Sequence, residues 1–185
     1  MRTLTELESC VLGAIWQRGP CTAYAIRREF ALSVTPYWSA SAGSIYPVVA
    51  RLRRLRLIEA ERTRWGERTR ARYAITSSGL AALRSWIGPP IPSEVVAPAF
   101  DALRTRVSYL GALSEAQRRR FVDRAIADIR RALADIRERF AREPPVDPFD
   151  AIAESSVLDE LEARLGWLGR LARQLNVQVA KSAIM

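Results

Sequence analysis

The chain has 185 residues, of which 49% are hydrophobic, and a net charge of +9. This length suits one ordinary domain or two small ones, with enough apolar residues for a buried core. No run approaches the roughly 18 apolar residues needed to cross a bilayer, and the first ten residues lack a signal peptide's apolar character. We therefore expect a globular, cytoplasmic protein without a membrane partner.

The composition argues against an enzyme and against a metal centre. The sequence has no histidine and two cysteines, Cys10 and Cys21, which are too few ligands for a zinc site. Without histidine there is no Ser-His or Cys-His pair, and no glycine-rich phosphate loop stands out. We expect no catalytic residue, no metal and no cofactor, and we interpret the two cysteines as buried free thiols.

Positive charge is concentrated in the first half of the chain. Residues 1–88 contain 14 arginines and six acidic residues, whereas residues 89–185 contain 15 basic and 14 acidic residues. A basic half joined to a nearly neutral half is typical of a polyanion-binding domain linked to an assembly domain.

Helical signals open the basic half. The segment Thr5–Glu8 has the form of a capping box, which predicts a helix over 5–18. Thr22 can cap a second, short helix through Phe30. A polar, serine-rich connection is expected over 33–41. The second helix should place three side chains on its inner side, namely Ala23, Ile26 and Phe30.

The third helix is predicted from Ser41 to about Arg56. Its expected core face consists of Ile45, Val48, Val49, Leu52 and Leu55. Its opposite, exposed face carries Gly43, Pro47, Ala50 and Arg54, flanked by Tyr46 and Arg53 on one side and by Ser44 and Arg51 on the other. Small residues with cations at the edges suit close approach to a nucleic-acid groove.

A β-hairpin follows, because the apolar period changes from 3.6 to 2. Ala71, Tyr73 and Ile75 alternate with arginines, and 65–67 is the predicted turn. Five arginines surround the exposed loop, and we call them the wing arginines: Arg62, Arg64, Arg68, Arg70 and Arg72. They are either DNA-backbone contacts or an ordinary solvated face. A fourth helix, 76–87, completes the order of a winged helix-turn-helix domain.

Prolines in the segment Gly88–Pro92 mark a boundary, because successive prolines stiffen an extended linker. We expect a winged helix-turn-helix domain over 1–88, a linker over 89–97 and an α-helical domain over 98–185. The fold class is thus mainly α with a small β-hairpin.

The C-terminal half is predicted to be helical over 98–111, from a capping box at 114–117 onwards, and over 150–175. The second of these helices carries an apolar stripe of Val122, Ile126, Ile129, Leu133, Ile136 and Phe140. The last carries Leu158, Leu161, Leu165, Leu168, Ala172 and Leu175. Both are coiled-coil-like seams, which serve either an intramolecular antiparallel pair or a homodimer. A two-fold dimer would present two recognition helices about 34 Å apart.

The motif Gly43-Ser44-Ile45-Tyr46-Pro47, followed by Arg51-Leu52 and Leu57-Ile58, resembles the PadR family of bacterial transcriptional regulators. The match continues through 73–76 and Gly79 and covers most of 5–88. The C-terminal half is similar to the dimerisation domain of the longer, Vir-type members. Where the family often has Gly-Tyr-Glu in helix two, this chain has Ala23-Tyr24-Ala25, so only the tyrosine carries over.

The resemblance implies a homodimer that represses transcription from a palindromic operator in double-stranded DNA and is released by a small molecule. By family analogy the candidate DNA contacts are Tyr24, Ser44, Tyr46, Arg64, Arg68 and Arg70. The third helix adds Ser41, Arg51 and Arg54. Tyr46 is alternatively a flank residue that packs on the first helix. The seam leucines Leu158, Leu161, Leu165, Leu168 and Leu175 are the dimerisation candidates.

Similar proteins bind aromatic effectors near the dimer interface, for which this chain offers Trp16, Trp86 and Trp167, although a tryptophan is more often a core residue than a ligand contact. The competing hypothesis is a winged-helix adaptor that binds a protein partner instead of specific DNA. RNA binding is the weakest alternative, since no exposed aromatic platform is evident.

Overall fold

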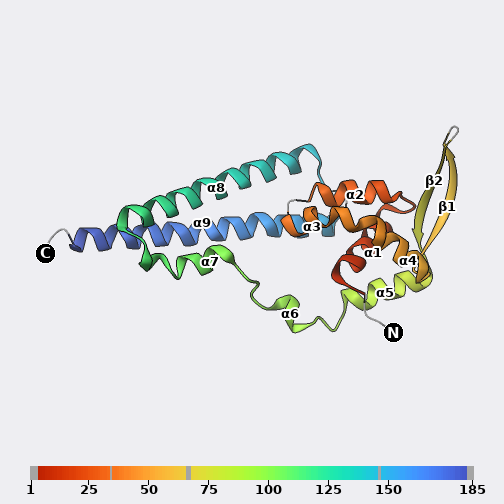
Figure 1. Ribbon diagram of the computed structural model, residues 1–185, viewed down its shortest axis with the longest axis horizontal. Coiled ribbons are helices and arrows are strands. Elements are labelled where there is room, and N and C mark those ends of the chain that lie inside the picture. Colours follow the sequence, from red (N-terminus) through yellow and green to blue (C-terminus); the bar gives the residue numbers. More distant parts are fainter. Residues whose placement is uncertain (1–3, 34, 66–67, 146, 183–185) are drawn as a thin grey trace. The chain divides into compact units, whose positions relative to one another are not determined.

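The computed structural model describes residues 4–33, 35–65, 68–145 and 147–182. For residues 36, 40, 62–65, 68–70 and 177–182 it describes the backbone alone. The chain divides into two compact units, Met1–Pro98 and Ala99–Met185, both visible in Figure 1. In the described residues, no helix is long and apolar enough to cross a membrane.

The first unit has helices around one core and a two-stranded antiparallel sheet. Its elements are α1 (Glu6–Arg18), α2 (Ala23–Ala31), α3 (Pro36–Ser41), the 3-10 turn η1 (Ala42–Ser44), α4 (Ile45–Arg54), β1 (Ile58–Trp65), β2 (Arg68–Ile75), α5 (Ser77–Ile87) and α6 (Ser93–Val96). The largest fully buried side chains of its core are Val11, Leu12, Ile15, Ile26, Ile45, Leu52 and Ile58. This order is the winged helix-turn-helix arrangement that the sequence predicts.

Local signals position most of these elements as expected. Thr5 and Glu8 form the predicted capping box, and the Thr22 hydroxyl accepts from the Ala25 amide at 3.1 Å. The strands pair from Ile58 opposite Ile75 to Trp65 opposite Arg68. Trp65, predicted in the turn, therefore ends β1, and the other two turn residues lie outside the described part of the chain.

Three sequence predictions in this unit are wrong. The connection over 33–41 contains α3, with Pro36 at its first turn, where a missing amide hydrogen costs least. The third helix is shorter than 41–56, because 42–44 form η1 and α4 ends at Arg54. Leu55 is consequently the C-cap and is 45% exposed instead of buried.

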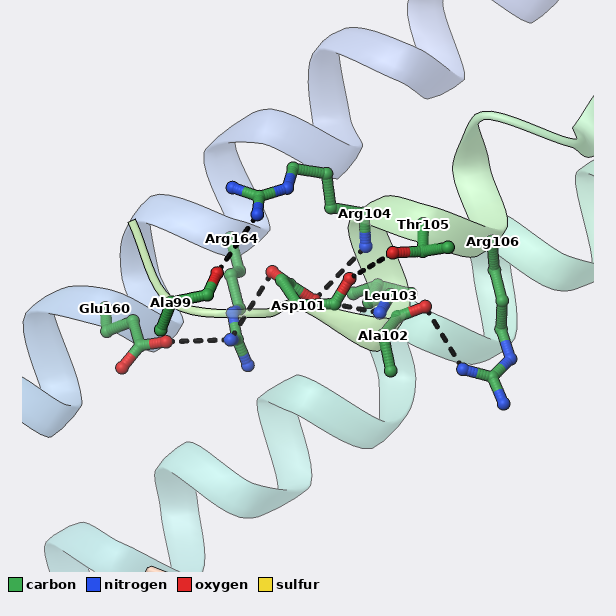
Figure 2. A network of polar contacts seen from close by, with 9 residues as sticks. All are labelled: Ala99, Asp101, Ala102, Leu103, Arg104, Thr105, Arg106, Glu160 and Arg164. Carbon is green, nitrogen blue, oxygen red and sulfur yellow. Dashed lines mark hydrogen bonds and ion pairs between the residues drawn. The ribbon is translucent and has the colours of Figure 1, made fainter. Parts of the chain in front are cut away.

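The second unit contains α7 (Ala102–Val107), the 3-10 turn η2 (Leu110–Ala112), α8 (Glu115–Arg142) and α9 (Pro148–Ser182). The predicted helix over 98–111 is therefore too long, because only α7 in its middle is α-helical and η2 follows near its end. The N-cap of α7 is Asp101, which accepts from the Leu103 amide at 2.8 Å and the Arg104 amide at 3.1 Å. Figure 2 shows this cap together with Arg164 of α9, whose Nη2 lies 3.4 Å from the Asp101 carboxylate. The carboxylate therefore connects α7 to α9.

The long helices α8 and α9 pack side by side as a hairpin (Figure 1). The described hydrophobic side chains that are buried in this unit are few: Leu110, Val122, Leu133 and Leu168. The intramolecular pairing of the two seams is thus real, but it leaves most seam residues only half-buried.

Candidate nucleic-acid interface

The helix α4 has one buried and one exposed face, as its periodicity predicts. Ile45 and Leu52 have no exposed surface and Val49 is buried, so these side chains attach the helix to the core. On the other face Pro47, Ala50 and Arg54 are exposed, and so is Gly43 in the preceding turn η1. A Cβ atom added at Gly43 would meet nothing within 4 Å. The small, open surface expected for groove contact is therefore present in the fold.

The candidates Tyr24, Ser44 and Tyr46 are all exposed. Tyr24 on α2 is 60% exposed and Tyr46 on α4 is 50% exposed, although large aromatic rings are usually well buried. Ser41 is half-buried, and its hydroxyl donates to the Tyr37 carbonyl at 2.8 Å. The tyrosines are thus available to a ligand, while the Ser41 hydroxyl already donates within the chain.

Arg51 has a partner inside the protein. Its guanidinium forms an ion pair with Glu8 of α1, a side chain that is 7% exposed. A phosphate contact would compete with this buried carboxylate. The geometry therefore assigns Arg51 to the packing of α4 on α1, and we withdraw it from the DNA contacts expected from sequence.

The strands β1 and β2 form the wing. The side chains of the candidates Arg64, Arg68 and Arg70 lie outside the described part of the structure, whose register places Arg64 opposite Thr69 and Arg68 opposite Trp65. Arg72 is described, and it donates to the carbonyl of Pro20 instead of standing free on the wing.

Sequence reasoning missed Tyr37, which α3 presents with 61% of its surface exposed. The neighbouring Trp38 attaches α3 to α2 through an edge-to-face contact with Phe30, with ring centroids 5.9 Å apart. Thr35-Pro36 is the signal that could have revealed this helix, since proline favours a first helical turn. With Tyr24 and Tyr46, the unit thus exposes a third tyrosine on its helices.

The three tryptophan candidates have different surroundings. Trp16 on α1 is 51% exposed, and Trp86 on α5 is 40% exposed and donates from its indole nitrogen to Glu6 at 2.7 Å. Trp167 on α9 is half-buried in the second unit. Neither Trp16 nor Trp86 is a core residue.

The two cysteines are free thiols, with Cys21 buried and Cys10 half-buried. Burial, reinforced by the charge of Glu6, raises the pKa of the Cys10 thiol to about 11. Burial likewise raises the pKa of Cys21, although Arg18 and Arg72 oppose the increase. In the described residues no group of three or more His, Cys, Asp or Glu side chains is arranged to hold a metal ion.

Among the dimerisation candidates, Leu168 has no exposed surface, whereas Leu158, Leu161, Leu165 and Leu175 are half-buried. Leu168 is therefore satisfied within the hairpin. The other four keep apolar surface that a second chain can cover.

The geometry defines a winged helix-turn-helix unit. Residues 11–85 match the model of the Transcriptional regulator PadR-like family. Most of the first unit is thus similar to this family, in agreement with the resemblance seen in the sequence. The proteins of this family are regulators, not enzymes. No curated protein matches the chain by sequence.

Solved structures share the fold over nearly the whole chain. Bacillus subtilis PadR in complex with operator DNA is 19% identical, with a TM-score of 0.78, covering 92% of this chain and 99% of that one. The same protein in complex with p-coumaric acid is 18% identical, with a TM-score of 0.75, covering 92% and 95%. The Vibrio cholerae virulence activator AphA is 20% identical, with a TM-score of 0.67, covering 94% and 99%.

Proposed function

We propose that this chain is a cytoplasmic homodimer that represses transcription by binding a palindromic operator, and that an aromatic small molecule relieves the repression. The observation that carries the proposal is the exposed face of α4 in a PadR-like unit, with Tyr24 and Tyr46 open to a ligand. Ser44 and Arg54 complete the described part of this surface, and we add the wing residues Arg64, Arg68 and Arg70. The helix supplies base contacts and the wing supplies phosphate contacts.

Charge supports DNA as the partner. Most of the chain's excess of positive charge lies in residues 1–88, the half that contains α4 and the wing. Cations that contact phosphates release counterions, which gives affinity with a steep dependence on salt. A protein-binding adaptor needs no such excess, so the charge distribution favours DNA over the adaptor alternative.

Dimerisation is supported by the incomplete core of the second unit. Two long helices expose much apolar surface when they pack only on each other, and bundles normally bury it with further helices. The half-buried leucines Leu158, Leu161, Leu165 and Leu175 give a second copy an apolar surface to cover. We accordingly assign 1–88 to DNA binding, 89–97 to a linker and 98–185 to dimerisation.

The ligands of related solved structures guide the remaining assignments. PadR of Bacillus subtilis has been solved with operator DNA and with p-coumaric acid, whereas AphA of Vibrio cholerae is a virulence activator. We favour repression and an aromatic effector for this chain. Trp16 and Trp86 in the first unit are partly exposed and Trp167 in the second is half-buried, and we assign each of them separately as a candidate effector contact.

The decisive experiment is fluorescence anisotropy of the purified chain with a labelled duplex from its own upstream intergenic region and with a scrambled duplex. Selective binding that weakens by about 10³–10⁵ between roughly 50 and 200 mM salt is the expected result for a dimer contacting some 6–10 phosphates. No binding at low salt, with a partner protein recovered instead, would favour the adaptor.

The finer assignments need their own measurements. Sedimentation at micromolar concentration should give a dimer, and a monomer would contradict the assignment of 98–185. A reporter gene behind the selected duplex should be silenced by the chain, whereas increased expression would indicate activation. Addition of p-coumaric acid as the probe should weaken the anisotropy signal, and Trp167→Phe should reduce that response.

A further inference from the structure

The guanidinium of Arg72 connects the wing to the helices. Arg72 lies on β2, and its Nε donates to the backbone carbonyl of Pro20 at 2.8 Å. Its Nη2 donates to the same oxygen. Pro20 lies between α1 and α2, so one side chain joins the strand that leads to the wing tip with the loop between these two helices.

Backbone hydrogen bonds join the next residue on each side of this contact, Cys21 and Tyr73. The Cys21 amide donates to the Tyr73 carbonyl at 3.1 Å, and the Tyr73 amide donates to the Cys21 carbonyl at 2.7 Å. Gly19, with a φ of 66°, occupies a backbone conformation that side chains disfavour and directs the chain into this position. The loop thus adds a short third segment to the hairpin, with the Arg72 side chain bonded beside it.

The choice of acceptor is informative. Glu61 is the register partner of Arg72 on β1 and offers a carboxylate on the neighbouring strand. The two hydrogen bonds that the Arg72 guanidinium donates nevertheless go to the neutral Pro20 carbonyl. Two donors converging on one oxygen use the planar fork of arginine, which a lysine lacks.

The position of this contact matters for the wing. Strands rise about 3.3 Å per residue, so Arg68 lies roughly 13 Å further along β2 than Arg72. A two-stranded hairpin is marginally stable alone. Small changes of angle at its base therefore become large displacements where Arg68 and Arg70 must meet phosphates.

We infer that Arg72 is a positioning residue, which sets the direction of the wing relative to α4 without contacting DNA itself. This inference rests on the proposed function and deepens it. It separates Arg72 from the other wing arginines, with which the sequence groups it, because its guanidinium, although exposed, donates to the Pro20 carbonyl of the same chain.

A thermodynamic cycle, in which an Arg72 substitution is one change and the loss of three wing arginines is the other, tests the inference. Arg72→Ala and Arg72→Lys are made in the full chain and in a background that carries Arg64→Ala, Arg68→Ala and Arg70→Ala. Affinity is measured for a labelled duplex of the sequence that the full chain selects from a random pool. Arg84→Ala, at an exposed arginine on α5, is the matched control for loss of charge.

We expect both Arg72 variants to weaken binding by roughly two- to tenfold in the full chain. In the background that lacks Arg64, Arg68 and Arg70, neither Arg72 variant should weaken DNA binding further. Retained affinity in Arg72→Lys, or an equal loss in both backgrounds, would mean that Arg72 contacts DNA directly and would overturn the inference.

Amide hydrogen exchange gives a readout that needs no DNA. In both variants the amides of Cys21 and Tyr73 should exchange faster than in the wild-type chain, and in Arg84→Ala they should not. Unchanged exchange would overturn the inference even if binding falls. Failure of the wild-type chain to bind any duplex would contradict the proposed function, while the exchange result would still decide whether Arg72 holds the hairpin.

Discussion

Glu8 on α1 and Arg51 on α4 form an ion pair, and the same carboxylate accepts from the Thr5 amide at 2.9 Å. Glu8 is only 5% exposed, so its charge is almost completely removed from water. One side chain therefore closes the first turn of α1 and fixes the helix that we assign to DNA recognition.

Replacing Glu8 with Gln should destabilise the protein strongly. The substitution leaves Arg51 partly buried without a countercharge, and loss of one partner of a buried pair costs about 3 kcal/mol or more. Urea unfolding measures the change. The matched control is Glu29→Gln, which breaks the more exposed pair with Arg18 and should cost about 1 kcal/mol or less. Equal costs for the two variants would contradict the structural role of Glu8.

Gly79 should not tolerate a side chain. A Cβ atom there would lie 2.0 Å from the Leu57 carbonyl oxygen and 2.8 Å from Cγ1 of Ile75. Because a backbone atom cannot move aside cheaply, Gly79→Ala should cost about 3 kcal/mol in the free energy of unfolding. Gly43→Ala meets nothing within 4 Å and should leave stability equal or slightly higher. Thermal unfolding of both variants checks the contrast.

Arg56 adopts a left-handed backbone conformation with a φ of 58°. Hydroxyl groups of Thr76 and Ser78 donate to its carbonyl at 2.9 and 3.0 Å and hold it there. Since this conformation costs a residue with a Cβ atom about 1–2 kcal/mol, Arg56→Gly should stabilise the chain by about 0.5–1 kcal/mol. Arg56→Ala should bring no such gain, and a gain in both variants would point to charge instead of backbone strain.

The ionised Asp101 carboxylate should stabilise the second unit most at pH values above the ordinary pKa of an aspartate. Burial raises its pKa, but hydrogen bonds from the Arg104 and Leu103 amides, with the charges of Arg164 and Arg104, lower the pKa overall (Figure 2). A lowered pKa means that the contribution is present above about pH 4 and is lost as pH falls through the folded-state value.

Two substitutions at Asp101 separate the cap from the ion pair. Asp101→Ala should cost about 1 kcal/mol at pH 7, the usual value for loss of an N-cap. Asp101→Asn keeps a capping oxygen and should cost less. Urea unfolding at pH 7 and near pH 3 provides the comparison, and a difference between wild type and Asp101→Asn that persists at the lower pH would contradict the charge argument.

Cys10 should react slowly with alkylating reagents. A pKa of about 11 instead of 9.0 leaves about 100-fold less thiolate at pH 8. In a Cys21→Ala chain, iodoacetamide should therefore modify folded Cys10 roughly that much more slowly than the urea-unfolded chain. The raised pKa also means that stability should fall as pH rises from about 9 to about 11, because the unfolded chain ionises first. The Cys10→Ala chain should not show the part of this loss of stability that comes from ionisation of the Cys10 thiol.

Much of the fold was predictable because its signals are local. The capping boxes at Thr5 and Ser114 are confirmed, and so is the hairpin that leads to Ile75. The helix α3 was missed because its few residues carry no apolar repeat, and Trp38 attaches it to Phe30 through a tertiary contact. Leu55 was misassigned because the periodicity does not show that α4 ends one residue earlier.

The sequence by itself determined the class of domain, the exposed and buried faces of α4 and the basic character of the first half, since these follow from spacing and composition. Only the tertiary structure decided that two of the described arginines are engaged within the protein. Arg51 and Arg72 look like their neighbours in the sequence, yet Glu8 and the Pro20 carbonyl engage them. Both partners are remote along the chain, and a guanidinium bonds to whatever acceptor folding brings within reach.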